Sequence, residues 1–310
     1  MQHRALALLL LWLVSLPAWG QPRVVVSIAP LHSLTAGVMA GVGQPQLLLP
    51  PGSSPHTYAL LPSDARALQA ADLVIWVGEG LEVFLRKPLT TLTAPDTRLA
   101  VAELPGLTLL PARSGPDWEG HDHDHHGHDG DAHGIDWHLW LDPRNAAVVV
   151  TALGERLAAL DPANAGRYRD NAQALTERLQ ALDRELAERL APLRGRAYMV
   201  FHDAYQYFEH RYGLTSIGAI TVSPERLPGA RRVAEIRAEL RQRQVRCLFR
   251  EPQFEPSLVQ AIVRGSDVRV GVLDPEGADL APGPELYFAL LRALGANLSE
   301  CLQRSAGSAP

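Results

Sequence analysis

Three isolated histidines occupy positions at which this chain could hold a metal ion. His56 follows the apolar segment 46–49, His138 precedes the sequence LWLDP, and His202 directly follows the apolar segment 197–201. Strand ends of an open α/β sheet border the crevice in which ligands bind. Neutral imidazole nitrogens suit zinc, which three histidines and a carboxylate or water can hold tetrahedrally. The spacings of 82 and 64 residues match no short zinc motif, so three unrelated structural histidines are the alternative.

One carboxylate is a candidate for a role beside these histidines. Asp274 follows the apolar segment 268–273 and therefore falls at the same kind of strand end. Glu209 and Glu251 are present too, but nothing in the sequence marks either as a general base. A zinc hydrolase would suit three histidines with an open position, yet the chain has no H-E-x-x-H helix and no recognisable pair of catalytic carboxylates. The pattern therefore favours a binding site over an active site.

A histidine-rich tract lies within the polar, low-complexity segment 111–135, which is predicted to be a flexible loop. Ordering such a loop costs roughly 1–2 kcal/mol per residue, so we expect it to bind zinc more weakly than an ordered site does. Its predicted role is to collect or sense zinc near the cleft; the alternative is a solvated acidic insert with incidental metal binding. The predicted auxiliary ligands are His121, His123, His125, His126, His128 and His133.

Apolar and amphipathic segments alternate in both halves of the chain, a pattern typical of an α/β fold with parallel sheets. Between the halves, apolar residues recur at every third or fourth position over 162–190 and predict one helix about 42 Å long. We therefore predict two α/β lobes, 21–160 and 193–310, joined by a long rigid helix within 161–192, with the metal site in the cleft between the lobes. The predicted strands are 24–29, 46–49, 72–78, 99–101, 197–201, 214–220, 246–249 and 268–273.

Residues 1–20 have the features of a secretory signal peptide. Arg4 precedes a short apolar run, and small residues precede the expected cleavage site before Gln21. The chain has a net charge of −5 and no basic stripe, which argues against nucleic acid as a partner. In an exported protein the two cysteines, Cys247 and Cys301, are expected to form a disulfide; two buried free thiols are the alternative.

Five motifs resemble those of one group of exported proteins. The chain contains, in this order, GSSPHTYALLPSD, WHLWLDPRNA, FHDAYQYFEHRYGL, REPQFEP and LDPEG. Together they resemble the ZnuA-like periplasmic zinc-binding proteins of ABC importers, within the cluster A-I solute-binding proteins, and the likeness covers essentially the whole mature chain. The resemblance implies two α/β lobes joined by a long rigid helix, with the metal buried between them. It also implies an acidic His-rich loop before the second ligand and a disulfide between Cys247 and Cys301.

The same resemblance assigns the metal ligands residue by residue. The first, second and third ligand histidines of the family fall on His56, His138 and His202, and its fourth-position aspartate falls on Asp274. Whether Asp274 binds the metal, gives way to water or orients a histidine stays open. Manganese-binding relatives have Glu at the third position, so the imidazole of His202 favours zinc, because it makes the site softer and removes a negative charge. Some zinc-binding relatives have an acidic residue directly before the first histidine, where this chain has Pro55.

The function implied by the resemblance is binding rather than catalysis. The protein would be a monomeric, periplasmic, high-affinity zinc-binding component of an ABC uptake system. It would deliver Zn²⁺ to an inner-membrane permease with its cytoplasmic ATPase, and a periplasmic zinc chaperone is a further candidate partner. The alternatives are the same scaffold carrying Mn²⁺ or Fe²⁺, a zinc-dependent hydrolase, and a metallochaperone or surface adhesin.

Overall fold

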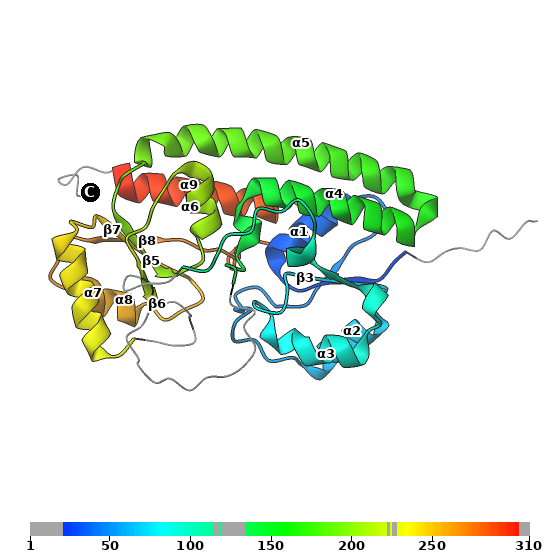
Figure 1. The fold of residues 1–310 in the computed structure, drawn as a ribbon, viewed down its shortest axis with the longest axis horizontal. Coiled ribbons are helices and arrows are strands. Elements are labelled where there is room, and N and C mark those ends of the chain that lie inside the picture. The colour runs from blue at the N-terminus through cyan, green and yellow to red at the C-terminus, as the bar shows by residue number, and fades with distance from the viewer. Residues whose placement is uncertain (1–20, 114–117, 119–133, 222–223, 225–227, 304–310) are drawn as a thin grey trace, which may run out of the picture.

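The computed structural model describes most of the chain and shows two lobes (Figure 1). The predicted signal peptide and the six tract histidines lie outside the described residues. Within the described ranges the chain forms two parallel four-stranded sheets flanked by helices, which confirms the predicted two-lobed α/β fold. No helix of these ranges combines the length and the apolar character that crossing a membrane requires. The described residues are 21–113, 118, 134–221, 224 and 228–303.

The first lobe is built around one of these sheets. Its elements are β1 (Val24–Val26), α1 (Ala29–Val38), β2 (Gln46–Leu47), α2 (Pro62–Ala70), β3 (Leu73–Trp76), α3 (Arg86–Leu92) and β4 (Arg98–Ala100). The strands run parallel in the order β2-β1-β3-β4. Helix α1 lies on one face, and α2 and α3 lie on the other (Figure 1). The central strands β1 and β3 are therefore buried on both sides, which explains their unbroken apolar sequences.

The second lobe repeats this arrangement. Its elements are β5 (Tyr198–His202), α6 (Gln206–Tyr212), β6 (Ala219–Thr221), α7 (Ala230–Gln242), β7 (Cys247–Arg250), α8 (Ser257–Val263), β8 (Arg269–Val272) and α9 (Leu286–Gln303). The strands run parallel in the order β6-β5-β7-β8. Side chains along β5 alternate, with Tyr198 in the main core and Met199 in a smaller cluster. The predicted disulfide between Cys247 and Cys301 is present and ties β7 to α9.

A layer of helices connects the two lobes. Helix α5 (Ala165–Leu190) follows α4 (Pro143–Leu160), and its 26 residues span about 39 Å. It contacts α1 and α4 of the first lobe and α6 and α9 of the second (Figure 1).

Helix α9 forms a second brace between the lobes, because it also contacts α1. The backbone N–H of Tyr287 donates to Ser33 Oγ at 3.0 Å, and its hydroxyl donates to the carbonyl of Trp140 at 2.7 Å. One continuous apolar core runs through both lobes. Such a connection resists bending, so the site between the lobes is held by a stiff frame.

Candidate metal centre

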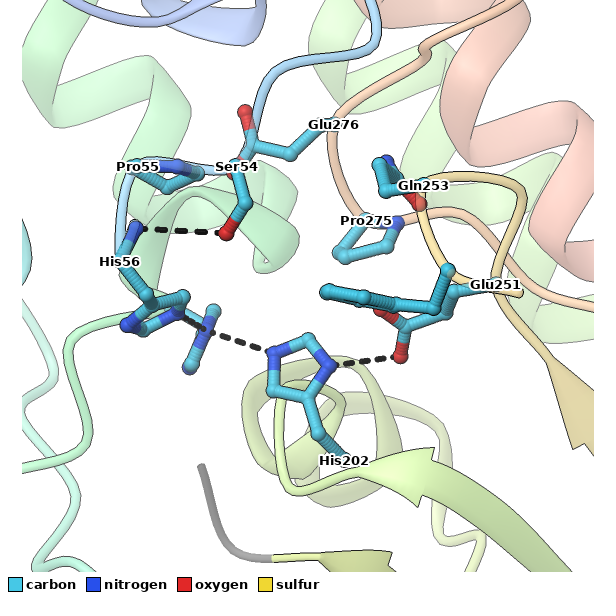
Figure 2. Close-up of a pocket in the computed structure, with 10 residues that line it drawn as sticks. Ser54, Pro55, His56, His202, Glu251, Gln253, Pro275 and Glu276 are labelled. Atoms are coloured by element: carbon cyan, nitrogen blue, oxygen red, sulfur yellow. Dashed lines mark hydrogen bonds and ion pairs between the residues drawn. The ribbon is translucent and has the colours of Figure 1, made fainter. Parts of the chain in front are cut away.

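Three imidazoles from distant parts of the chain meet between the lobes (Figure 2). His56 lies in the loop after β2, His138 precedes the turn Leu139–Leu141 that leads into α4, and His202 is the last residue of β5. Nε2 of His138 lies 3.4 Å from Nε2 of His56 and 3.3 Å from Nε2 of His202. A tetrahedral zinc ion with Zn–N bonds of about 2.0–2.1 Å separates its ligand atoms by about 3.3–3.4 Å. Two of the three pairs of nitrogen atoms therefore already stand at the spacing of zinc ligands, and all three histidines place a ring nitrogen within 4.8 Å of the others.

Two carboxylates determine which ring nitrogens carry hydrogen. Asp136 Oδ1 accepts from Nδ1–H of His138 at 2.8 Å and from its backbone N–H at 2.9 Å. Glu251 Oε1 accepts from Nδ1–H of His202 at 2.6 Å and from the Tyr205 hydroxyl at 3.1 Å. Because a carboxylate only accepts, each Nδ1 bears the hydrogen and each Nε2 presents a lone pair. The two lone pairs face each other across 3.3 Å, an arrangement that a cation between them stabilises.

The site is small and largely closed to solvent. His138 and His202 are 7% and 3% exposed, and His56 is half-buried. Burial lowers the pKa of His56 well below its usual 6.5, and electrostatic interaction with the neighbouring imidazoles of His138 and His202 lowers it further. His56 is therefore neutral at pH 7, as a metal ligand must be. The space that the pocket leaves free is about 10 Å³, enough for one small ion or water molecule.

Aromatic packing holds the segment that carries His138. The Trp137 ring lies against Gly80, where an added Cβ would come within 2.0 Å of the ring. Trp140 donates from Nε1 to the carbonyl oxygen of Pro275 in the second lobe at 2.9 Å. The histidine between these two tryptophans is thereby fixed against both lobes.

Asp274 lies outside the group of imidazole ligands. Its Oδ1 accepts from Gln253 Nε2 at 2.7 Å and from the backbone N–H groups of Glu276 at 2.9 Å and Gly277 at 3.0 Å, and its Oδ2 accepts from that of Ala278 at 2.6 Å. In the described part of the chain, the group whose ligand atoms lie within 4.8 Å of one another consists of the three histidines. The carboxylate expected at the fourth position is thus engaged in holding a turn in this structure.

The sequence alone predicts no role for three buried carboxylates beside the imidazoles, which are Asp136, Glu251 and Glu276. Glu251 directly follows β7, so the strand-end rule that singled out His202 applies to it as well. Asp136 also has a local signal, because it lies two residues before His138 and can reach its ring. Glu276 has no such signal, since its position depends on the fold of the turn after β8.

The Glu276 carboxyl lines the pocket in a strongly acidic surrounding. Burial raises the pKa of Glu276 well above its usual 4.5, and the nearby charges of Asp274, Glu82 and Glu251 raise it further. A positive ion in the pocket would offset this concentration of carboxylates.

Comparison with known proteins identifies the family. The family described as "ZnuA: Zinc-uptake complex component A periplasmic" matches residues 24–301. The chain is 43% identical over 306 residues to the high-affinity zinc uptake system protein ZnuA of Brucella suis, covering 91% of this chain and 92% of that protein. It is 39% identical over 290 residues to the protein of the same name from Yersinia pestis, covering 90% and 91%. A crystal structure of ZnuA is similar with a TM-score of 0.76 and 26% identity, over 91% of this chain and 99% of that one. This chain therefore belongs to the ZnuA family of periplasmic zinc-uptake components.

Proposed function

We propose that this protein is the high-affinity zinc-binding component of an ABC importer in the periplasm. It delivers Zn²⁺ to an inner-membrane permease that a cytoplasmic ATPase drives. The observation that carries the proposal is the convergence of three imidazoles, with Nε2 of His138 at separations from the other two that suit zinc ligands. The relatives named above, which are high-affinity zinc uptake system proteins, support the same cargo.

The donor set favours zinc over manganese or iron. Three imidazole nitrogens form a softer set than the carboxylate and water oxygens that suit Mn²⁺. Glu251 accepts the hydrogen bond from Nδ1–H of His202. Glu251 therefore strengthens the imidazole as a metal ligand and does not replace it as a ligand. Competitive titration tests the cargo: the protein should keep Zn²⁺ in the presence of a large excess of Mn²⁺ or Fe²⁺. A site that prefers Mn²⁺ would overturn the assignment.

The size of the pocket favours cargo binding over hydrolysis. The free space of about 10 Å³ suits a single small ion, whereas organic ligands occupy clefts of roughly 300–1,000 Å³. A hydrolase also needs a general base within reach of the metal-bound water. Of the carboxylates beside the pocket, Asp136 and Glu251 each use one oxygen to hold an imidazole, which is a role in metal binding rather than in catalysis.

Release of zinc starts at His56. Among the described residues no carboxylate bonds to its ring, whereas His138 and His202 are each held by one. His56 also lies in a loop and is half-buried, so it can move while the braced frame stays in place. Docking on the permease would need to shift only this loop to reduce the ligand set to two imidazoles.

The histidine-rich tract acts as a weaker, auxiliary zinc site. Deleting residues 120–134 should leave one tightly bound zinc per protein in calorimetry, because the three imidazoles lie outside the deleted segment. Loss of the tight site on this deletion would contradict the assignment of tight binding to the three imidazoles and of weaker binding to the tract.

Single substitutions among His56, His138 and His202 test the metal site itself. His138→Ala should abolish tight zinc binding in competition with a chromophoric chelator, since it removes the central imidazole of the three. The matched control is His210→Ala, which removes an exposed histidine of α6. Unchanged zinc affinity in His138→Ala would refute the proposed site.

A further inference from the structure

A rigid turn after β8 presents one carboxylate to the metal pocket. Asp274 accepts the backbone N–H groups of this turn, including that of Glu276 at 2.9 Å. Gly277 adopts a φ of +76°, which glycine reaches without strain. The indole N–H of Trp140 bonds to the Pro275 carbonyl at 2.9 Å and ties the same turn to the first lobe. The backbone at Glu276 is therefore fixed from both sides.

The side chain of Glu276 is buried in the pocket, and one of its carboxyl oxygens lacks a hydrogen-bond partner among the described residues. The residue is 9% exposed and lines the pocket together with the three histidines. In Figure 2 its side chain extends from the turn toward Ser54 and Pro55 of the opposite lobe. Its Oε1 is buried and has no hydrogen-bond partner among the described residues. A buried carboxylate without a donor is unfavourable unless a cation reaches it.

We infer that Glu276 supplies the fourth ligand of the zinc ion, and that Asp274 is the positioning residue that holds it there. This inference rests on the proposed function. Glu276 lies outside the group of ligand atoms that come within 4.8 Å of one another, so its side chain must turn toward the ion. Glu has three side-chain torsions for this purpose, and the turn need not move. One oxygen of Glu276 then lies about 2.0–2.2 Å from zinc. The negative charge of the carboxylate reduces the net charge of the buried site from +2 to +1.

The other buried carboxylates beside the imidazoles already hold these rings through one oxygen each. Glu251 Oε1 already holds His202 and Tyr205, and Asp136 Oδ1 already holds His138. With Glu276 as the fourth ligand, each lobe contributes two ligands to the ion. Any separation of the lobes then removes half of the coordination at once.

The substitution Glu276→Gln tests the assignment in the full chain, with Glu255→Gln as the matched control. Glu255 is exposed on the same lobe, so its replacement removes the same charge away from the pocket. Three quantities are measured: the zinc dissociation constant, the visible d–d absorption of the Co²⁺-loaded protein, and the melting temperature of the metal-free protein. The Co²⁺ spectrum reports the ligand set directly, which a purely structural residue would not alter.

Glu276→Gln should raise the zinc dissociation constant at least about tenfold, the lower end of what even a partner of a ligand contributes. It should also change the Co²⁺ spectrum. The melting temperature of the metal-free variant should equal or exceed that of the original protein, because an unpartnered buried carboxylate is removed. Glu255→Gln should change none of the three quantities.

Two results would overturn the inference while leaving the proposed function intact. One is tight zinc binding in the original protein with unchanged affinity and Co²⁺ spectrum in Glu276→Gln. The other is a changed Co²⁺ spectrum in Asp274→Asn but not in Glu276→Gln, which would make Asp274 the ligand. If His202→Ala binds zinc as tightly as the original protein, the proposed function itself fails.

Discussion

Replacing Glu251 by Gln measures how strongly a buried carboxylate supports zinc binding by His202. Glu251 is 1% exposed, and its Oε1 accepts from Nδ1–H of His202 at 2.6 Å. Glutamine keeps the size and an acceptor oxygen but loses the charge. A hydrogen bond to a charged group contributes about 1.5–3 kcal/mol and a neutral one about 0.5–1.5 kcal/mol, so the loss is about 1–1.5 kcal/mol. That corresponds to an increase in the zinc dissociation constant of about five- to twelvefold.

The assay is an equilibrium competition between the protein and a chromophoric zinc chelator, with Glu255→Gln as the exposed control. Glu251→Gln should weaken binding while the control does not. Melting of the metal-free variants shows whether both remain folded. A folded Glu251→Gln variant with the zinc affinity of the original protein would refute the claim that this carboxylate orients and strengthens the His202 imidazole.

Three further predictions follow from the packing, the titration and the cross-link of the chain. Gly80→Ala should weaken zinc binding, because the added methyl group displaces the Trp137 ring next to His138. Gly229→Ala places its methyl group in open space and should not weaken binding. Equal zinc affinities of the two variants would contradict this prediction. The lowered pKa of His56 means that the unfolded chain binds a proton there at higher pH than the folded chain, so the stability of the metal-free protein should fall as pH drops below 6.5. Thermal melts of the metal-free His56→Gln variant should show a smaller loss of stability below pH 6.5 than those of the original protein. An equal loss would refute the assignment of this pH dependence to His56. Reducing the disulfide, which spans 54 residues, should cost about 4 kcal/mol in denaturant unfolding. Zinc affinity should remain unchanged, because the cross-link lies away from the pocket.

The fold was predictable because its signals are local. Parallel strands covered on both faces leave unbroken apolar runs, and the buried stripe of α5 leaves a regular spacing over 26 residues. The strand expected at 214–220 appears only as Ala219–Thr221. The reason is that the N–H groups of Leu214 and Ser216 bond back to Glu209 of α6, which no hydrophobic pattern records.

The candidate site was predictable only in part. The strand-end rule and the family motifs point to His56, His138 and His202, and the structure brings these imidazoles together. The role of Asp274 in a turn, and the exposure of Glu276 to the pocket, depend on hydrogen bonds that form only after both lobes have packed. The bond from Trp140 to the carbonyl of Pro275 joins residues 135 positions apart, and single-sequence patterns carry no information at that distance.

The most direct test of the central claim is an anomalous-scattering map at the zinc edge from crystals of the zinc-loaded protein. We expect one strong peak about 2.0–2.1 Å from the Nε2 atoms of His56, His138 and His202. A map with no peak among these three imidazoles, and with zinc only at other positions of the chain, would contradict the claim that they form the cargo site.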